Sequence, residues 1–392
     1  MQKYIHSIID LDLYKLTQQN FALKLFPREY VRYDFINRDH RPFPKGFDSL
    51  LQKAVDSMTD LTLNQEGYEF MKRKCYYLDQ SYLDFLKGYR LDPNEVLIKQ
   101  DGEDLKVRVE GLWYRAILWE TILMSIISEI YFEEMEMPPP ARNTLVAINA
   151  NKAQIFHNND IHFVDFGTRR RFSFHNHVNV ISDMMIYGRE HFMGTSNVYL
   201  AQQFDQTPIG TAAHELFSLM AAIYGFNMAN TMAMEKWVEV YGGDLGIVLP
   251  DTFTSDVFLK SFNTKHAKLW DGARQDSGNP IEFADKFIEH YKKLRIDPMS
   301  KTIVFSDALN TEKVLKIEKH CKGKIKTSYG IGTFLTNDIP DVKPLNIVIK
   351  LTGRKTDETW MPTVKLSDDL GKHTGDPEMI ELCKKTLMIK DK

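Results

Sequence analysis

The feature that most constrains the fold is a repeated alternation of short apolar runs with helical patterns after residue 160. Each run ends in a polar loop, and a helical pattern follows; the runs lie at 161–164, 246–249, 266–270, 302–305 and 324–329. A further helical stretch leads into the loop at 194–197. Strands that alternate with helices predict a parallel sheet. About six such units predict a closed or nearly closed α/β barrel.

The segments on either side of this repeat predict a second, smaller domain of mixed α/β type. Residues 1–112 contain helical patterns at 49–59 and 65–74, and a predicted hairpin pairs 95–99 with 105–110 around an Asp101-Gly102 turn. A long helix is expected over 113–134, before three prolines at 138–140. The tail predicts strands at 346–351 and 362–366 and a helix at 377–387. We therefore expect a barrel domain at 113–345 and a smaller domain made of 1–112 joined by 346–392.

Charge and cysteine content exclude several classes of function. The 392 residues carry a net charge of −3, so no strong basic field favours nucleic acid or an anionic membrane. The longest apolar stretch, at 118–127, is far shorter than a membrane span, and the first residues do not form a secretory signal. The cysteines lie at positions 75, 321 and 383, too far apart for a metal motif or a disulfide framework. We expect a cytoplasmic protein that binds neither membranes nor nucleic acid.

Polar motifs follow the predicted strands at the positions where an α/β barrel carries its chemistry, the carboxyl ends of the strands. They are Asp165–Arg171, Gly194–Asn197, Pro250–Thr252, Arg274–Gly278, Ser306–Asp307 and Gly330–Thr333. These loops are expected to converge on one mouth. The alternative is ordinary turn chemistry, since Asp, Gly and Ser also occupy loops for conformational reasons.

The order of these motifs carries a family resemblance. The runs VDFGTRRRFS, GTSN, GTAAHE, LGIVLPD, RQDSGNP, VFSDAL and SYGIGTFLTNDIPDVKPLNIVIKL, with DLDLYKLTQQ near the start, resemble the nicotinate phosphoribosyltransferase family. The resemblance implies a barrel domain beside a smaller α/β domain, in a homodimer with sites at the subunit boundary. It also implies that nicotinate and phosphoribosyl pyrophosphate (PRPP) combine to nicotinate mononucleotide, with ATP as co-substrate, Mg²⁺ and a phosphohistidine, in NAD biosynthesis.

Five residues match the part of the family site that binds the pyridine ring. The resemblance makes Arg169 a ligand for an anion, and the sequence leaves open which of Arg169, Arg170 and Arg171 meets nicotinate and which meets phosphate. Phe166 and Tyr14 match the aromatic residues that stack on the two ring faces, Tyr14 from the second subunit. Thr195 and Ser196 are further substrate-binding residues, and Ser196 stands where nicotinamide-specific relatives have an aspartate. The alternatives are a core position for Phe166 and a helix N-cap for Ser196.

A second set matches the residues that hold PRPP. The resemblance makes Arg274 a pyrophosphate or PRPP ligand, and it makes Asp276 an acceptor for a ribose hydroxyl or a residue associated with magnesium. Asp307 matches another acceptor for a ribose hydroxyl, and Asp251 is a further candidate. In the glycine-containing loop after a late strand, Gly330, Gly332 and Thr333 match a 5′-phosphate site. The alternative for Asp276 and its neighbour Ser277 is a cap on the helix expected over 281–294. The magnesium ligands are not identified.

His214 is the residue that the resemblance assigns to phosphorylation by ATP. Thr211 is predicted to cap the helix that follows, which puts His214 in the first turn, where the helix dipole disfavours protonation. A neutral imidazole is a competent nucleophile, and the same helix end suits a phosphoryl group. The alternative is an ordinary surface histidine.

Three other functions remain open at this point. A nicotinamide phosphoribosyltransferase would differ mainly at position 196, and a quinolinate-type enzyme would need a more basic pocket and no GTAAHE histidine. A catalytically silent barrel would not need the set Arg274, Asp276, Asp307 and His214. The chain departs from the family pattern after Lys372, where His373-Thr374-Gly375 follow, so no role is assigned to 365–375.

Overall fold

A computed structural model describes residues 4–139, 141–369 and 372–389 of the chain. The chain divides into two compact units. The first unit comprises residues up to 28, 32–210 and 331–350, and the second comprises 29–31, 211–330 and the residues from 351 onward. This division follows contacts within the chain, so the domain boundaries expected at 112/113 and 345/346 stay a prediction.

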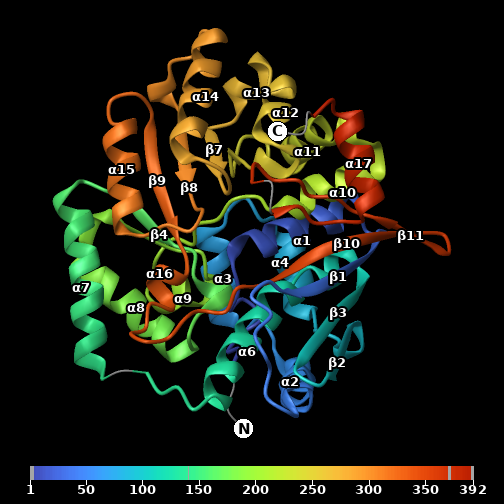
Figure 1. The fold of residues 1–392 in the computed structure, drawn as a ribbon, viewed down its shortest axis with the longest axis vertical. Coiled ribbons are helices and arrows are strands. Elements are labelled where there is room, and N and C mark those ends of the chain that lie inside the picture. The colour runs from blue at the N-terminus through green and yellow to red at the C-terminus, as the bar shows by residue number, and fades with distance from the viewer. Residues whose placement is uncertain (1–3, 140, 370–371, 390–392) are drawn as a thin grey trace. The chain divides into compact units, whose positions relative to one another are not determined.

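The second unit contains four parallel strands, in the order β9-β8-β7-β6. They are β6 (Ile247–Val248), β7 (Gly272–Gln275), β8 (Thr302–Phe305) and β9 (Lys326–Ile331). The helices α14 (Pro280–Lys293) and α15 (Thr311–Cys321) each connect one strand to the next, as parallel pairing requires, and lie beside the sheet in Figure 1. The predicted parallel α/β repeat is confirmed here.

One predicted strand is wrong. Residues 266–270 belong mostly to a helix, α13 (Thr264–Leu269), which Asn263 caps by accepting a hydrogen bond from the backbone N–H of His266 at 3.2 Å. The strand is β7, which begins at Gly272 and is buried throughout. Arg274 is therefore a strand residue rather than part of the loop that follows.

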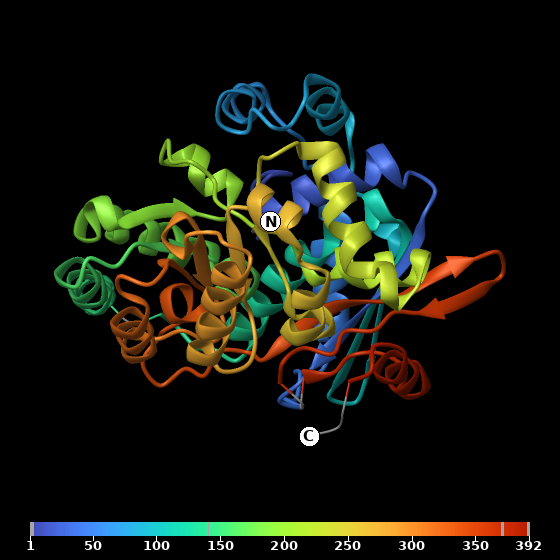
Figure 2. The ribbon, with the colours of Figure 1, turned by 90° about the horizontal axis from the view of Figure 1, so that it is seen from above.

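The remaining elements of the second unit are helices and a hairpin. The helices are α10 (His214–Tyr224), α11 (Phe226–Tyr241), α12 (Ser255–Ser261) and α17 (Pro377–Thr386). The strand predicted near 362–366 lies earlier, as β11 (Thr359–Pro362), and pairs antiparallel with β10 (Ile347–Thr356). This orange-red hairpin projects from the ribbon in Figure 2.

The first unit combines an antiparallel sheet with a parallel strand pair. Its antiparallel strands run in the order β1-β3-β2, with β1 (Tyr30–Asn37), β2 (Val96–Asp101) and β3 (Asp104–Leu112). Gly102 has φ of 61° in the β2–β3 turn, as the Asp-Gly signal predicts. The parallel pair is β4 (Phe163–Asp165) with β5 (Phe192–Thr195). The expected mixed α/β fold is confirmed.

The first unit contains one long buried helix and several further helices. Helix α6 (Trp119–Glu134) is buried from Trp119 to Phe132, and the helix expected over 113–134 is divided into α5 (Trp113–Ala116) and α6. The others are α1 (Leu13–Leu25), α2 (Phe47–Asp56), α3 (Gln65–Lys74), α4 (Gln80–Gly88), α7 (Arg142–Asn158), α8 (Phe174–Tyr187), α9 (Val198–Gln203) and α16 (Thr333–Thr336). Among the described residues, no helix has the length and hydropathy that crossing a bilayer requires.

The close pairing of β7 and β8 leaves no room for a side chain at Gly272. A Cβ atom there would overlap the backbone oxygen of Thr302 on β8. We expect Gly272→Ala to lower the free energy of unfolding by about 1–3 kcal/mol, because the strand must shift. Gly88→Ala is the control, since a Cβ at Gly88 meets nothing within 4 Å. Urea unfolding of both variants measures the difference, and equal stability would contradict the packing argument.

Candidate active site

In the first unit, four of the predicted pyridine-site residues lie close to one another at the ends of β4 and β5. Arg169 belongs to a short 3₁₀ turn after β4, and Ser196 directly follows β5. The backbone oxygen of Ser196 accepts a hydrogen bond from the N–H of Leu13 at 2.8 Å, which brings the start of α1 to this edge. The Arg169 guanidinium carbon consequently lies 5.9 Å from the centre of the Tyr14 ring.

Tyr14 and Arg169 of the same chain thus lie side by side, whereas the resemblance brings the tyrosine from a second subunit. The phenol is buried, and burial raises its pKa. Phe166 is half-buried, so it does not occupy the fully buried core position that was the alternative. Its backbone N–H donates to the oxygen of Ile331 at 2.8 Å, which fixes the strand end that carries it.

A buried carboxylate that the sequence did not single out, Asp12, links this group. The Ser196 hydroxyl donates to Asp12 Oδ1 at 2.6 Å, and the Arg169 Nε lies 3.8 Å from Asp12 Oδ2. Burial raises the pKa of Asp12, although Arg169 and Ser196 oppose this effect. Ser196 is not the N-cap of α9; Asn197 is, because its side chain accepts from the N–H of Leu200.

A second acid lies on the other side of Arg169. The guanidinium is 3.6 Å from Glu120, which also pairs with the fully buried Lys15 at 2.5 Å. Burial opposes ionisation of Glu120, but Lys15 and the other nearby cations outweigh it and lower the pKa of this carboxyl. Arg169 keeps 30% of its side chain exposed, so an incoming anion can reach it.

Thr195 and Arg171 have internal partners. The Thr195 hydroxyl donates to Asp165 Oδ2 at 2.6 Å, and the His177 Nε2 contacts the same oxygen at 2.7 Å. Arg171 is fully buried and contacts Asp10 through two nitrogens, at 2.9 and 3.2 Å. Arg171 is therefore part of a buried ion pair.

In the second unit, His214 is the first residue of α10 and faces two acids. Its Nε2 lies 3.1 Å from Asp276 Oδ2 and 3.7 Å from Asp251 Oδ1, and its Nδ1 lies 2.9 Å from the Thr252 hydroxyl. Burial, followed by the charge of Lys365, lowers the pKa of His214 to about 4, even though both acids oppose the change. The imidazole is consequently neutral at pH 7, as the sequence predicted.

The predicted cap of this helix is wrong. The N-cap residue of α10 is Ala213, which makes no side-chain cap hydrogen bond. The Thr211 hydroxyl instead accepts a hydrogen bond from the Arg274 NH1 at 2.9 Å. Thr211 thus contributes to the arginine network rather than to the helix end.

Arg274 uses every nitrogen of its guanidinium in hydrogen bonds. Besides Thr211, it donates to the Ser306 hydroxyl at 2.7 Å and to Asp276 Oδ1 at 2.7 Å. Burial would raise the pKa of Asp276, but Arg274 and then His214 hold it well below its usual range. Asp276 therefore stays ionised between a guanidinium and a neutral imidazole.

The predicted capping role of Asp276 or Ser277 is also wrong, because Asn279 caps α14 by accepting from the N–H groups of Ile281 and Glu282. The Ser277 hydroxyl donates to Asp251 Oδ2 at 2.5 Å and accepts from the N–H of Asp368 at 3.0 Å. Asp368, in the segment to which no role was assigned, thus contacts Ser277, which in turn contacts Asp251 beside His214.

Asp307 lies among basic residues rather than beside Asp276. Lys372 Nζ is 3.0 Å from Asp307 Oδ1, and Lys313 Nζ is 3.6 Å from Oδ2. Burial would lower the pKa of Lys372, but its partners Asp369 and Asp307 raise it. The sequence missed both lysines.

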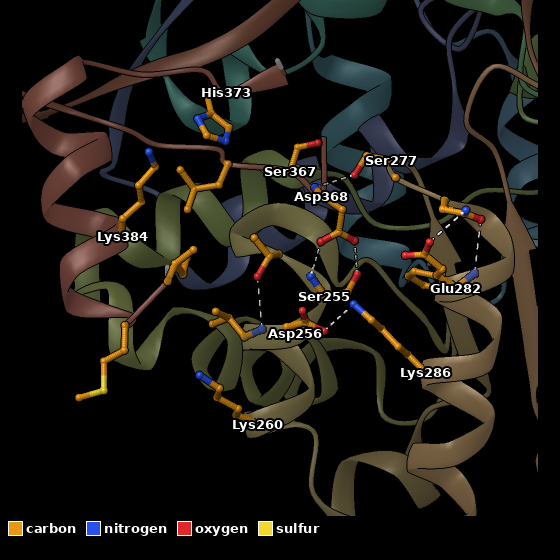
Figure 3. Close-up of a pocket in the computed structure, with 18 residues that line it drawn as sticks. Ser255, Asp256, Lys260, Ser277, Glu282, Lys286, Ser367, Asp368, His373 and Lys384 are labelled. Atoms are coloured by element: carbon orange, nitrogen blue, oxygen red, sulfur yellow. Dashed lines mark hydrogen bonds and ion pairs between the residues drawn. The ribbon is translucent and has the colours of Figure 1, made fainter. Parts of the chain in front are cut away.

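A cavity of about 550 Å³ lies beside Ser277 and Asp368 (Figure 3). Its wall mixes bases and acids, and Lys286 pairs with Asp256 across part of it at 2.7 Å. His214, Arg274 and Asp276 are not among the described residues that line it. The cavity touches the histidine network through Ser277 and through Leu366, whose backbone N–H donates to the oxygen of Thr252 at 2.8 Å.

The glycine loop is divided between a strand and a helix. Gly330 lies within β9, whereas Gly332 and Thr333 begin α16. A Cβ at Gly332 would meet the Phe166 oxygen at 3.4 Å, an ordinary contact. The phosphate role of this loop stays a prediction, as does the convergence of all six loops on one mouth.

Comparison with known proteins identifies the family. The model of the nicotinate phosphoribosyltransferase family matches residues 161–391, and that of its N-terminal domain matches residues 9–128. A nicotinate phosphoribosyltransferase of Chromohalobacter salexigens is 49% identical over 386 residues, covering 98% of this chain and 99% of its own. One of Methanosarcina mazei is 41% identical over 399 residues, covering 96% and 97%. The chain belongs to the nicotinate phosphoribosyltransferase family.

Solved structures agree with this assignment. The crystal structure of nicotinate phosphoribosyltransferase from Porphyromonas gingivalis has a TM-score of 0.96 and 43% identity, covering 98% of this chain and all of its own. One described as a putative nicotinate phosphoribosyltransferase from Saccharomyces cerevisiae has a TM-score of 0.93 and 32% identity, with complete coverage of both chains. The family resemblance and the α/β fold are confirmed, while the roles of single residues stay predictions.

The lowered pKa of His214 makes stability depend on pH. The imidazole is neutral when folded but gains a proton below about pH 6.5 when unfolded, so its contribution to stability is lost as the pH falls from about 6.5 toward 4. We expect His214→Asn to remove this loss. The free energy of unfolding of the variant minus that of wild type should therefore be about 2 kcal/mol larger at pH 5 than at pH 7.5. Urea unfolding at both pH values measures this, with the exposed His175→Asn on α8 as control. A pH-independent difference would contradict a buried neutral His214.

Proposed function

We propose that the chain catalyses the condensation of nicotinate with PRPP to nicotinate mononucleotide and pyrophosphate, a step of NAD biosynthesis. The observation that carries the proposal is the match of nearly the whole chain to proteins with this activity in their name, at up to 49% identity among those described above. The proposed chemistry divides into recognition of the pyridine acid, binding of PRPP and coupling to ATP.

Nicotinate recognition is assigned to the group around Arg169. A guanidinium binds a carboxylate through two parallel hydrogen bonds, and the half-buried Phe166 and the Tyr14 ring offer aromatic faces to a flat ring. The Ser196 hydroxyl adds no charge of its own. Burial raises the pKa of Asp12, and the Arg169 guanidinium, 3.8 Å away, offsets the charge of its carboxylate. The group therefore favours the acid over the amide.

PRPP binding is assigned to Arg274, Asp276, Asp307 and the loop with Gly330, Gly332 and Thr333. Asp276 and Asp307 can accept hydrogen bonds from ribose hydroxyls, which orients the anomeric carbon for attack. Lys372 and Lys313, which flank Asp307, add positive charge for the pyrophosphate.

Magnesium fits the acids of the second unit. Asp251 Oδ1 is buried and has no hydrogen-bond partner among the described residues, and Mg²⁺ prefers such carboxylate oxygens. Asp251 and Asp276 are the residues that would hold it. When bound, the ion neutralises charge on the pyrophosphate as it leaves.

His214 is assigned the phosphoryl-transfer step. The lone pair of a neutral ring nitrogen attacks the γ-phosphorus of ATP, the bond to the bridging oxygen breaks, and ADP leaves. Hydrolysis of the phosphohistidine then releases phosphate and drives the transfer forward. Asp276 and Thr252 orient the ring through its two nitrogens.

The assembly and location are also proposals. We infer a homodimer by analogy with the family. A cytoplasmic enzyme fits the three cysteines, which are buried and unpaired: Cys75, Cys321 and Cys383.

The choice of substrate tests the proposal. We expect turnover with nicotinate, PRPP, ATP and Mg²⁺ and little with nicotinamide. Ser196→Asp should raise the KM for nicotinate about tenfold or more, because a second carboxylate beside Asp12 repels the substrate. Ser196→Asn, which adds bulk without charge, is the control. A wild-type preference for nicotinamide would sink the assignment to nicotinate, and an unchanged KM in Ser196→Asp would sink the charge argument.

The coupling of ATP is tested at His214. We expect His214→Asn to lose ATP hydrolysis and ATP stimulation, while some transfer remains at high PRPP. The exposed His175→Asn on α8 serves as control. ATP hydrolysis and mononucleotide formation are measured in parallel, and a variant that couples the two as well as wild type would exclude the phosphohistidine.

A further inference from the structure

Three histidines and two acids gather in the first unit where α7 ends and β5 begins. His157 lies in the last turn of α7, and Asp160 and His162 lie in the link to β4. Glu190 and His191 lie in the short 3₁₀ turn Arg189–His191, directly before β5. None of these residues contributes to the proposed transferase site.

The distances among three of these side chains match the spacing of ligands around a metal ion. His157 Nδ1 lies 3.1 Å from His191 Nδ1, and Glu190 Oε1 lies 3.9 and 3.8 Å from these two nitrogens. The point equidistant from the three atoms lies about 2.1 Å from each, the length of zinc bonds to histidine nitrogen and carboxylate oxygen. The three ligand atoms are therefore close enough together to reach one ion.

The second nitrogen of His191 has the partner that metal-binding histidines usually have. Its Nε2 lies 3.1 Å from Asp160 Oδ1. A carboxylate in this position accepts the Nε2–H and so leaves the Nδ1 lone pair directed at the ion. The arrangement selects the tautomer that a metal requires.

Exposure around the cluster permits entry of an ion and a fourth ligand. The His191 side chain is only 8% exposed, which holds its ring in place, whereas Glu190 is 67% exposed. His162 is exposed, and its ring centre lies 5.1 Å from that of His191. A ring nitrogen of His162, a carboxylate oxygen of Asp160 and a ring nitrogen of His191 form a second group, and these three atoms lie within 4.8 Å of one another. Water can therefore supply a fourth ligand to the group of His157, Glu190 and His191.

We propose that His157, Glu190 and His191 bind one zinc-type divalent cation. Two imidazole nitrogens favour Zn²⁺, Co²⁺ or Ni²⁺ over Mg²⁺, which takes oxygen ligands. The ion joins the end of α7 to the segment that enters β5, and so holds in place the strand that ends at Thr195. The site does not depend on the proposed transferase activity. The alternative is a simple hydrogen bond between His157 and His191 with no affinity for metal.

The test uses the full chain, stripped of metal with a chelator and kept in Mg²⁺, and titrates it with Zn²⁺ by calorimetry. We expect wild type to bind one equivalent that His157→Ala and His191→Ala do not bind. Asp160→Asn keeps the positive φ of 58°, which asparagine tolerates, and should bind about 10–100-fold more weakly. Co²⁺ should give the visible absorption of a tetrahedral site in wild type only.

Two controls keep the result decisive. His175→Ala, an exposed histidine of α8, should keep the full zinc stoichiometry. The exposed Glu190→Gln can fold even if the buried His191→Ala fails, and it should also weaken zinc binding. Equal zinc stoichiometry and affinity in wild type, His157→Ala and Glu190→Gln would overturn the proposal. Nicotinate turnover in metal-free His157→Ala is a separate readout, and its loss or retention bears on the transferase alone.

Discussion

One half-buried carboxylate, Asp276, links three segments of the second unit. An ionised carboxylate that is partly withdrawn from water is costly unless charges and hydrogen bonds compensate it. Here Arg274 supplies a charge-assisted hydrogen bond at 2.7 Å, the Ser306 hydroxyl donates at 2.8 Å, and the His214 ring lies at 3.1 Å. Three segments that are distant in sequence, at residues 214, 274–276 and 306, are thereby held at the carboxyl ends of parallel strands.

In the first unit, the carboxylate of Asp165 likewise holds separate segments together through hydrogen bonds. Its two oxygens bind the Thr195 hydroxyl, the His177 ring and the N–H of Gly167, at 2.6 to 2.8 Å. These bonds fix the ends of β4 and β5, from which Arg169 and Ser196 extend toward Asp12. Thr195 therefore acts through the strand ends rather than through contact with an anion. Burial of polar groups in this unit serves mainly to position the few side chains that stay accessible.

The parts predicted from the sequence were those governed by local rules. The β8 strand at 302–305, the Asp101-Gly102 hairpin and the position of His214 in a first helical turn follow from periodicity and turn chemistry alone. Capping was predicted less well, because Thr211, Ser196 and Ser277 each found a partner from a distant segment that outcompeted the adjacent helix end. The assignment of 266–270 failed because a helix of six residues is too short for its period to be recognised.

Contacts that depend on tertiary packing could not be predicted from the local sequence. Asp12 and Glu120 flank Arg169 from α1 and α6, and Lys372 reaches Asp307 from the chain's last segment. The histidines of the proposed metal site are separated by the whole of α8 and lack the close spacing of a zinc motif. The order of the family motifs therefore identified the reaction, whereas the acids and bases around the substrate-binding residues could be identified only from the fold.

The two candidate anion-binding arginines differ in how accessible they are to a substrate. Arg274 is 9% exposed and donates from all three nitrogens to internal acceptors, so its guanidinium is held in one orientation and little of it is open to a phosphate. Arg169 is 30% exposed, and its contacts with Asp12 and Glu120 are 3.8 and 3.6 Å, longer than a direct hydrogen bond. A carboxylate can therefore approach Arg169 at lower cost. This difference fits the proposal of a multiply charged pyrophosphate at Arg274 and a singly charged aromatic acid at Arg169.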